Sequence, residues 1–394
     1  MRLAHWLRST AVVAVGAAVV AAALPAAAAE PSTMKGISTK EARAVAEDYA
    51  QIVEAHYDAS IASAQQLQTA ITAFVASPTA ETLAAAKQAW LTARDDYLPT
   101  EAYRLYGGPI DADETGLEGQ INAWPMDEAY VDGVVGDTNA GIVNDTATYP
   151  QITQEVLVEA NEKGGETNIS TGWHAIEFLL WGQDTVAGQP GQRPVTDFTT
   201  APNAARRAMY LTTATDLLVS DLETVRAEWE PGTKFRKQWA KSPASSVTKI
   251  LRGIGALSAG ELAGERMAVA YETKDQEDEH SCFSDNTNAD VLGDQIGIQR
   301  VYLGELPDGT TVPASLSTLV AKVDPELDAS LQAQMDTAVA KIGAFPAPFE
   351  ELIVGNDDAP GRVALLAALE ALETQGKQIA KVAKVLGVKI TLEV

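Results

Sequence analysis

The chain has 394 residues, of which 54 are Asp or Glu and 29 are Lys or Arg, so its formal net charge at pH 7 is −25. This excess of negative charge argues against binding to nucleic acid or to anionic membranes, because every approach to phosphate groups is repulsive. A single cysteine excludes an internal disulfide and a cysteine-based zinc finger, and 46% hydrophobic with 21% charged residues indicates a folded chain long enough for two domains.

Residues 1–29 have the pattern of a secretory signal peptide. Arg2 and Arg8 supply the basic end, residues 11–24 are an apolar run, and Ala27-Ala28-Ala29 is a small-residue cleavage site. The apolar run is too short for a stable transmembrane helix, no comparable run follows it, and no cysteine stands at the cleavage site to carry a lipid. The sequence therefore predicts an exported, periplasmic protein with no membrane span, which keeps three histidines: His56, His174 and His280.

Apolar residues recur at helical spacing along most of the remaining chain. The first such stretch runs from Thr39 to about Ser77, and a second begins at Thr79 and should end or kink at Pro99. Residues 107–147 are rich in glycine and aspartate, which predicts a loop with short helices. Further helices are predicted at about 150–163, 172–181, 201–229, 243–274, 325–343 and 361–386.

Two segments interrupt the helical pattern. Tyr302 to Thr311, with Pro307-Asp308-Gly309 at its centre, predicts a small β-hairpin, and Val186 to Pro202, with three prolines, predicts a linker. No series of strands supports a sheet. We therefore expect an all-α fold of two packed helical bundles with a small β-hairpin insertion, the N-terminal bundle covering residues 36–190 and the C-terminal bundle residues 200–394.

The segment with the clearest chemical character is residues 170–182. His174 and Glu177 are three residues apart on a predicted helix, so their side chains emerge about 5–6 Å apart on one face. An imidazole and a carboxylate at this spacing can form half of a zinc or iron site. The short pattern fits a neutral core histidine bonded to a nearby acid as well, and the apolar neighbours predict burial in either case.

The helix before Pro99 carries a second group of candidates. Trp90, Arg94, Tyr97 and Glu101 recur at steps of four, three and four, which would place them on one stripe of an unbroken helix. An arginine in such a stripe fits a structural bridge to a carboxylate on another helix. Glu101 is the more plausible metal ligand of the two charged residues.

The helix predicted at 243–274 ends in carboxylates. Glu261, Glu265 and Glu272 continue a stripe that begins with apolar residues, so this end of the helix either lines a polar cleft or emerges into solvent. Emergence into solvent is the preferred interpretation for Glu261 and Glu272. Glu265 is kept as a candidate ligand.

Residues 275–287 combine five acids with a histidine and the only cysteine. Asp278 and its neighbours offer oxygen donors that can hold or attract a cation beside His280. Their spacing matches no calcium loop, and a solvated acidic loop accounts equally well for the composition. Cys282 is either a soft ligand or a small buried hydrophobe.

Familiar catalytic motifs are absent from the sequence. No HExxH, Walker loop, dinucleotide fingerprint or CxxC occurs, and Ala256-Leu257-Ser258-Ala259-Gly260 misses the nucleophile-elbow pattern at its first position. With three histidines left after export, a catalytic triad has few residues to draw on.

Together these motifs resemble those of the imelysin-like family. Gly172-Trp173-His174-Ala175-Ile176-Glu177 matches its GxHxxE motif, and Trp90 to Glu101, Trp124-Pro125 and residues 276–287 are similar to its bacterial members. The resemblance covers essentially the whole chain after residue 29. It implies an all-α fold of two bundles, an exported location and a link to iron-regulated genes, since relatives include the iron-regulated protein A type and periplasmic ferrous-iron uptake components. The family is also named after an insulin-cleaving metallopeptidase, because HxxE is similar to the motif of zinc carboxypeptidases.

Three functional hypotheses follow, in order of preference. The first is a periplasmic protein that binds a divalent metal, iron or zinc, and acts in iron uptake or trafficking with a membrane component of an iron-uptake system as partner. The second is a zinc-dependent peptidase using the HxxE pair, for which no general base can be named. The third is a metal-free module that binds a peptide or glycan. In the first hypothesis the metal site lies at the interface of the two bundles. Its ligands are His174, Glu177, Glu101, Glu265 and His280, and the supporting residues are Gly172, Trp173, Arg94, Trp90, Asp278 and Cys282.

Overall fold

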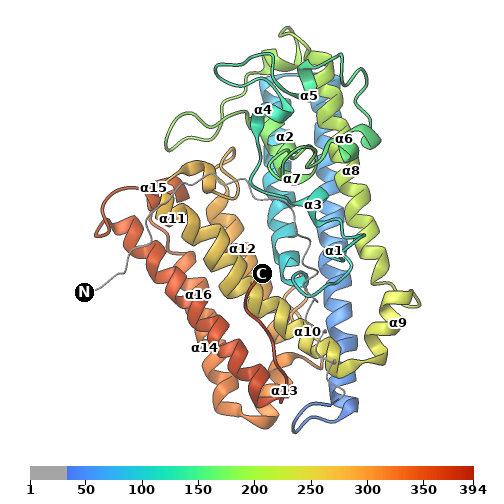
Figure 1. The fold of residues 1–394 in the computed structure, drawn as a ribbon, viewed down its shortest axis with the longest axis vertical. Helices are drawn as coiled ribbons and strands as arrows, with labels where there is room; N and C mark the ends of the chain where they lie inside the picture. Colours follow the sequence, from blue (N-terminus) through green and yellow to red (C-terminus); the bar gives the residue numbers. More distant parts are fainter. Residues whose placement is uncertain (1–32) are drawn as a thin grey trace, which may run out of the picture. The chain divides into compact units, whose positions relative to one another are not determined.

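The computed structural model describes residues 33–394, so the predicted signal peptide at residues 1–29 lies outside the described residues. Helices dominate residues 33–394, and the only strand pairing among them consists of isolated bridges. The α-helices labelled in Figure 1 are α1 (Thr39–Ala76), α2 (Ala80–Tyr97), α3 (Glu118–Ile121), α4 (Glu128–Val131), α5 (Gly141–Asn144), α6 (Gln154–Ala160), α7 (Gly172–Trp181), α8 (Ala204–Glu228), α9 (Lys234–Lys241), α10 (Pro243–Ala256), α11 (Val269–Thr273), α12 (Thr287–Leu303), α13 (Leu316–Val323), α14 (Pro325–Ile342), α15 (Phe349–Ile353) and α16 (Pro360–Val385). Three 3₁₀ helices and one π-helix are also present in this range: Leu98–Tyr103, Val195–Phe198, Gln276–Asp278 and the π-helix Leu257–Ala268.

The first two helices begin where the sequence predicts them, at residues that can cap a helix. The Ser38 hydroxyl accepts from the N–H of Glu41 (3.3 Å), and the Glu41 carboxylate accepts in return from the N–H of Ser38 (2.9 Å). Thr79 and Thr82 form the same reciprocal arrangement at the start of α2. Pro99 lies in the 3₁₀ helix that follows α2, so the predicted break is confirmed.

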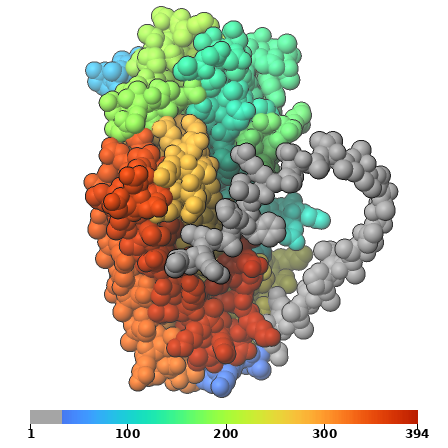
Figure 2. All heavy atoms as spheres, turned by 60° about the vertical axis from the view of Figure 1, so that its left-hand side comes forward, coloured from blue at the N-terminus to red at the C-terminus, as the bar shows by residue number. Residues whose placement is uncertain are grey.

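Long helices pack around the core of one compact unit. α1 packs against α2 and α8, and α7 contacts both α2 and α8. α16 packs against α14 and α10, and Figure 2 shows α14 and α16, in orange and red, together on one face. α12 packs against the 3₁₀ helix that follows α2, and this contact brings distant parts of the sequence together at the candidate site.

The close approach of α12 to the segment after α2 depends on a glycine. A Cβ atom built at Gly297 would lie 2.5 Å from the carbonyl oxygen of Pro99, a distance that real Cβ atoms do not reach. Gly297 therefore allows the backbone of α12 to rest directly on the 3₁₀ helix. Without this contact, the residues of α12 would stand farther from those of α2.

The predicted helices at 172–181, 201–229, 325–343 and 361–386 are confirmed as α7, α8, α14 and α16. The helix predicted at 243–274 is present as α10, the π-helix and α11 in succession. The sequence pattern missed α9, α12, α13 and α15. Of these, α12 matters most, because it carries a central residue of the candidate site.

The predicted β-hairpin at Tyr302–Thr311 is not confirmed. Tyr302 lies inside α12, and the remainder is a turn closed by a single antiparallel bridge between Glu305 and Thr311. Tyr302 is fully buried, and its hydroxyl donates to Asp328 on α14 (2.8 Å). Packing of the end of α12 against α14 thus extends the helix into the segment where local turn residues suggested a strand.

The division into two bundles is likewise not confirmed, because contacts group residues 31–394 into one compact unit. The boundaries 36–190 and 200–394 stay predictions. The predicted linker at 186–202 is packed against the protein through Arg193, which is buried and pairs with Asp132 (2.9 Å). No helix in residues 33–394 has both the length and the apolar character needed to cross a membrane.

Candidate functional site

Helix α7 begins at a glycine whose conformation and surroundings both exclude a side chain. Gly172 has φ +79°, and a Cβ built on it would lie 2.4 Å from the carbonyl oxygen of Ile121 and 2.7 Å from that of Gln120. An L-residue at such a φ costs about 1–2 kcal/mol. Gly172 therefore allows the first turn of α7 to pack directly against α3. Because His174 lies two residues after Gly172, this contact fixes where His174 stands.

The histidine and glutamate of the GxHxxE motif form a fully buried pair. His174 Nδ1 lies 3.0 Å from Glu177 Oε2, and neither residue is exposed. The backbone N–H and the hydroxyl of Ser284 both donate to Glu177 Oε1, at 2.9 and 2.6 Å. Both oxygens of Glu177 are thus engaged, so this carboxylate orients the imidazole and ties α7 to the acidic segment 107 residues later in the chain.

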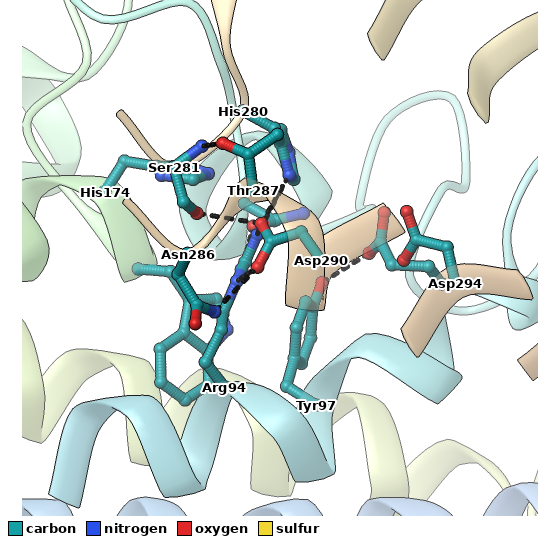
Figure 3. A network of polar contacts seen from close by, with 12 residues as sticks. Arg94, Tyr97, His174, His280, Ser281, Asn286, Thr287, Asp290 and Asp294 are labelled. Carbon is teal, nitrogen blue, oxygen red and sulfur yellow. Dashed lines mark hydrogen bonds and ion pairs between the residues drawn. The ribbon is translucent and has the colours of Figure 1, made fainter. Parts of the chain in front are cut away.

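His280 is held by a carboxylate that the sequence analysis did not single out. His280 Nδ1 lies 2.7 Å from Asp290 Oδ2, which also accepts from Arg94 (2.8 Å) and from the Ser281 hydroxyl (2.8 Å). Figure 3 shows these side chains converging on Asp290. The interhelical bridge predicted for Arg94 thus joins α2 to α12. Asp290 was missed because it lies in the first turn of a helix that the periodicity did not predict.

The two imidazoles lie next to each other. The ring centroids of His174 and His280 are 4.9 Å apart, and the ring of Trp124 lies 4.8 Å from that of His174 on another side. A carboxylate occupies Nδ1 of both histidines, which leaves Nε2 of each as the nitrogen available to a ligand. Nε2 of His174 is buried and has no hydrogen-bond partner among residues 33–394. Histidine ligands of metals typically have this arrangement, with a carboxylate on the other ring nitrogen.

Burial and a nearby arginine keep both imidazoles neutral. Burial lowers the pKa of His174 well below its usual value, and the charge of Arg94 lowers it further. Burial also lowers the pKa of His280 to about 4. Burial raises the pKa of Glu177 to about 8, although the hydrogen bonds from Ser284 act against this rise. At neutral pH the pair therefore holds two protons, one on the His174 ring and one on the Glu177 carboxyl. A metal ion bound at Nε2 would require the ring proton on Nδ1 and an ionised Glu177, so binding would release the carboxyl proton.

An acid-rich cavity of about 490 Å³ adjoins the imidazoles. His280 and Trp124, the two ring neighbours of His174, both line this cavity. Two other residues singled out in the sequence, Glu265 and Asp278, line it as well. Its remaining charged lining residues are Glu118, Glu162, Glu166, Glu261, Arg104 and Arg266. The excess of carboxylates over arginines makes the cavity attractive to cations.

Glu101 is placed in a separate ionic cluster. Its carboxylate accepts from the Tyr97 hydroxyl (2.7 Å), from Arg104 (2.5 Å) and from Arg266. Burial would raise the pKa of Glu101, but the two arginines more than reverse that effect and bring it below its usual value. Arg266 also pairs with Asp294 of α12 (2.8 Å). Two guanidinium groups therefore occupy the carboxylate that was expected to bind metal.

The π-helix changes the expectation for Glu261. This residue is half-buried, accepts from Arg266 (2.9 Å) and lines the cavity, so the prediction that it emerges into solvent is wrong. The two residues are five apart, and the i→i+5 repeat of a π-helix stacks such residues on one face. Glu272 lies beyond the π-helix and is exposed, as expected.

The remaining supporting residues are structural in position. Trp90 Nε1 donates to the Trp173 carbonyl (3.2 Å), and both rings are fully buried, in an edge-on contact. The guanidinium of Arg94 lies 5.8 Å from the centre of the Trp173 ring. Cys282 is a buried free thiol, and burial raises its pKa well above the usual value. The interpretation of Cys282 as a small buried residue therefore fits the structure better than that of a thiolate ligand.

A group of three carboxylates offers another arrangement suited to a metal. Asp184, Asp285 and Glu350 each present an oxygen, and these atoms all lie within 4.8 Å of one another. Burial, together with the charges of Glu350 and Asp184, raises the pKa of Asp285 to about 7. Asp285 belongs to the acidic segment at residues 275–287, whereas Asp184 and Glu350 lie elsewhere in the sequence and are part of no motif. No spacing rule could have joined acids from three separate parts of the chain.

Comparisons with known proteins agree on one family and one fold. The model of the imelysin family matches residues 53–379. A protein named iron-regulated protein A from Synechococcus elongatus is 27% identical over 334 residues, covering 82% of this chain and 80% of that protein. The crystal structure of an iron-regulated protein A precursor from Parabacteroides distasonis has a TM-score of 0.69 at 18% identity and covers 90% of this chain and 98% of that one. An imelysin-like protein from Psychrobacter arcticum has a TM-score of 0.64 at 13% identity, with 91% and 99% covered.

Proposed function

This chain belongs to the imelysin family, and we propose that it binds iron through the imidazoles of His174 and His280, beside the acid-rich cavity. The choice of iron follows from the similarity to a protein named for iron regulation. Imidazole nitrogen is a suitable ligand for iron as well as for zinc. An exported carrier that passes iron to a membrane component is the role that fits the signal peptide predicted at residues 1–29.

The observation that carries the proposal is the unpartnered Nε2 of His174. A buried polar atom without a partner costs about 1–3 kcal/mol, so such atoms in a core call for an explanation. Here Nδ1 is held by Glu177 and the neighbouring ring is His280, itself held by Asp290. A metal ion between two imidazoles that carboxylates orient would satisfy Nε2 and use both carboxylates as their partners.

The cavity supplies what two imidazoles alone lack. Two nitrogen ligands leave several coordination positions of an iron ion to water or to oxygen donors brought in with the metal. Glu265 and Asp278 line the cavity and offer carboxylates on the approach to His280. A site with few protein ligands exchanges its ion more readily than a closed four-ligand site, and this property suits a carrier.

The peptidase alternative receives less support from this geometry. A zinc peptidase needs a general base beside a metal-bound water. No such base can be named here, and Glu177, which this alternative uses as a zinc ligand, has both oxygens already engaged by His174 and by Ser284.

Metal titration of the protein and its variants tests the proposal. Fe²⁺ under anaerobic conditions and Zn²⁺ are titrated separately into wild type, His174→Ala and His280→Ala. Each histidine variant should bind the metal at least about tenfold more weakly. Replacing a residue that only orients a ligand already has an effect of this size, so loss of a ligand itself should have at least the same effect. Glu177→Gln should lose about 10–100-fold, because the ring loses its charged partner.

Asp285→Asn provides the matched control, since it alters the group of three carboxylates and leaves the imidazoles intact. It should bind iron as the wild type does. If Asp285→Asn loses the metal while both histidine variants keep it, the carboxylate group is the metal site and the proposal is wrong. Failure of the wild type to bind either ion would also overturn it. Circular dichroism of each variant checks that the fold is retained.

A further inference from the structure

A second cavity, of about 410 Å³, lies along one face of α12 and shares no lining residue with the cavity beside His280. Its apolar wall includes Leu292 and Ile296 of α12, and its polar residues include His56 of α1 and Arg300 of α12. This volume is within the range of about 300–1,000 Å³ usual for small-ligand sites. The metal proposal uses none of these residues.

His56 contributes an acceptor that nothing in the described part of the chain satisfies. The residue is only 2% exposed, and its Nδ1 lies 2.9 Å from the carbonyl oxygen of Ile52 and 2.8 Å from the Tyr103 hydroxyl. A carbonyl oxygen can only accept, so the hydrogen bond to Ile52 requires the hydrogen on Nδ1. The Tyr103 hydroxyl oxygen is then a second acceptor of this N–H, and Nε2 has a bare lone pair. Nε2 is buried and has no partner among residues 33–394. Burial lowers the pKa of His56 to about 4, so the ring stays a neutral acceptor at physiological pH.

The cavity has unpaired charges of opposite sign. Asp95 and Asp96, in the last turn of α2, line it as exposed residues, and neither carboxylate makes an ion pair or hydrogen bond with a residue in the range 33–394. The guanidinium of Arg300 also lines it and likewise lacks a partner among those residues. Charges left unpaired in a cavity are available to a ligand that carries the complementary groups.

The charges stand toward opposite ends of α12. The cavity is lined by residues of α12 from Ala289, in its first turn, to Arg300, in its last turn, and Asp95 acts electrostatically on Asp290 of the first turn. Ten residues separate Asp290 from Arg300, a rise of about 15 Å along a helix. An extended chain advances about 3.3–3.6 Å per residue, so about four residues span this distance.

We infer that this cavity binds a short extended peptide with free ends. The peptide's ammonium group pairs with Asp95 and Asp96, its carboxylate pairs with Arg300, and one of its N–H groups donates to His56 Nε2. The apolar wall contacts its side chains. A metal ion is a poorer occupant of this cavity. Among residues 33–394, the acids, histidines and cysteines grouped closely enough to hold a metal are Asp184, Asp285 and Glu350, and His56, Asp95 and Asp96 are not part of that group.

The test compares peptides with and without their terminal charges. Calorimetric titration of the full chain uses tetra-alanine with free ends, its N-acetylated form, its C-amidated form, and single alanine. Free tetra-alanine should bind with a stoichiometry of one, and each blocked form should bind at least tenfold more weakly. Single alanine should also bind at least tenfold more weakly, because it cannot reach both ends of the cavity.

Surface variants then assign each terminus. In Arg300→Gln the penalty for C-amidation should disappear while the penalty for N-acetylation stays. In the double variant Asp95→Asn/Asp96→Asn the penalty for N-acetylation should disappear while the penalty for C-amidation stays. None of these residues is buried, so the variants should fold, and His174→Ala should bind the peptide as the wild type does.

Three results would overturn the inference: no binding of free tetra-alanine, equal binding of single alanine, or blocking penalties that persist in the matching variants. Loss of peptide binding in His174→Ala would also overturn it, because it would place the peptide in the cavity beside His280. The outcome is independent of the metal titration, so either proposal can fail while the other stands.

Discussion

Replacing Gly172 by alanine should destabilise the protein by about 2–5 kcal/mol. Two costs contribute. An L-residue at φ +79° costs about 1–2 kcal/mol, and the added methyl group would lie 2.4 and 2.7 Å from two carbonyl oxygens of the backbone around α3. Those oxygens belong to the backbone and cannot rotate away as a flexible side chain would, so the start of α7 must shift, at the cost of about 1–3 kcal/mol typical of overpacking.

Gly107→Ala is the matched control for this change. Gly107 has a similar φ of +68°, but a Cβ built on it meets no atom within 4 Å. The control variant should therefore pay only the conformational cost of about 1–2 kcal/mol. The difference between the two variants, about 1–3 kcal/mol, isolates the contact between α7 and α3.

Urea denaturation followed by far-ultraviolet circular dichroism measures both variants under identical conditions. Iron affinity provides a second readout, since a shifted α7 moves His174 and Glu177 whereas a change at Gly107 moves neither. Equal losses of stability in the two variants would refute the argument from the close contact. Wild-type stability and iron affinity in Gly172→Ala would refute the role assigned to this glycine altogether.

Three further predictions concern charge. Arg94→Met should lower the free energy of unfolding, measured by urea denaturation, by about 3–5 kcal/mol, because it leaves the buried carboxylate of Asp290 unpaired. Arg226→Met breaks an exposed pair and should cost about 1 kcal/mol or less. Similar losses in the two variants would contradict this reasoning. Iron affinity should rise about tenfold per pH unit between pH 6 and 8, because binding displaces the proton that Glu177 holds with a pKa of about 8, and the same titration should be nearly flat in Glu177→Gln. Burial raises the pKa of Glu279 to about 9, so the folded state holds this proton more tightly than the unfolded state and loses stability as the pH rises from 5 to 9. The free energy of unfolding of Glu279→Gln should therefore rise relative to the wild type by about 2 kcal/mol or more between pH 5 and pH 9. Parallel curves of stability against pH for the two proteins would exclude the effect.

The local part of the site could be predicted from the sequence. Helix α7 has the predicted bounds at both ends, because its run of apolar residues and the C-cap glycine at 182 act within one helix. The spacing of His174 and Glu177 placed both on one helical face, and the structure has them 3.0 Å apart. The bridge expected for Arg94 exists for a similar reason, since a buried guanidinium requires a carboxylate.

The sequence could not identify the partners that come from far away in the chain. Asp290 pairs with Arg94 across 196 residues, and Ser284 binds Glu177 across 107. Neither partner is part of a periodic pattern, and each depends on how the acidic segment and α12 pack against the first helices. The expected hairpin is not confirmed for the same reason, because Tyr302 is buried against α14 as part of α12, and only a turn with one bridge, Glu305 to Thr311, is left at Pro307-Asp308-Gly309.

Composition and local spacing therefore determined by themselves that this chain folds from helices and that His174 and Glu177 lie on one helical face. The tertiary structure decided that Glu177 orients a ring, that arginines occupy Glu101 and that His280 stands beside His174. The physical reason is the range of the interactions. Helix formation and spacing depend on neighbours within a few residues, whereas the environment of a buried charge depends on every segment that packs around it.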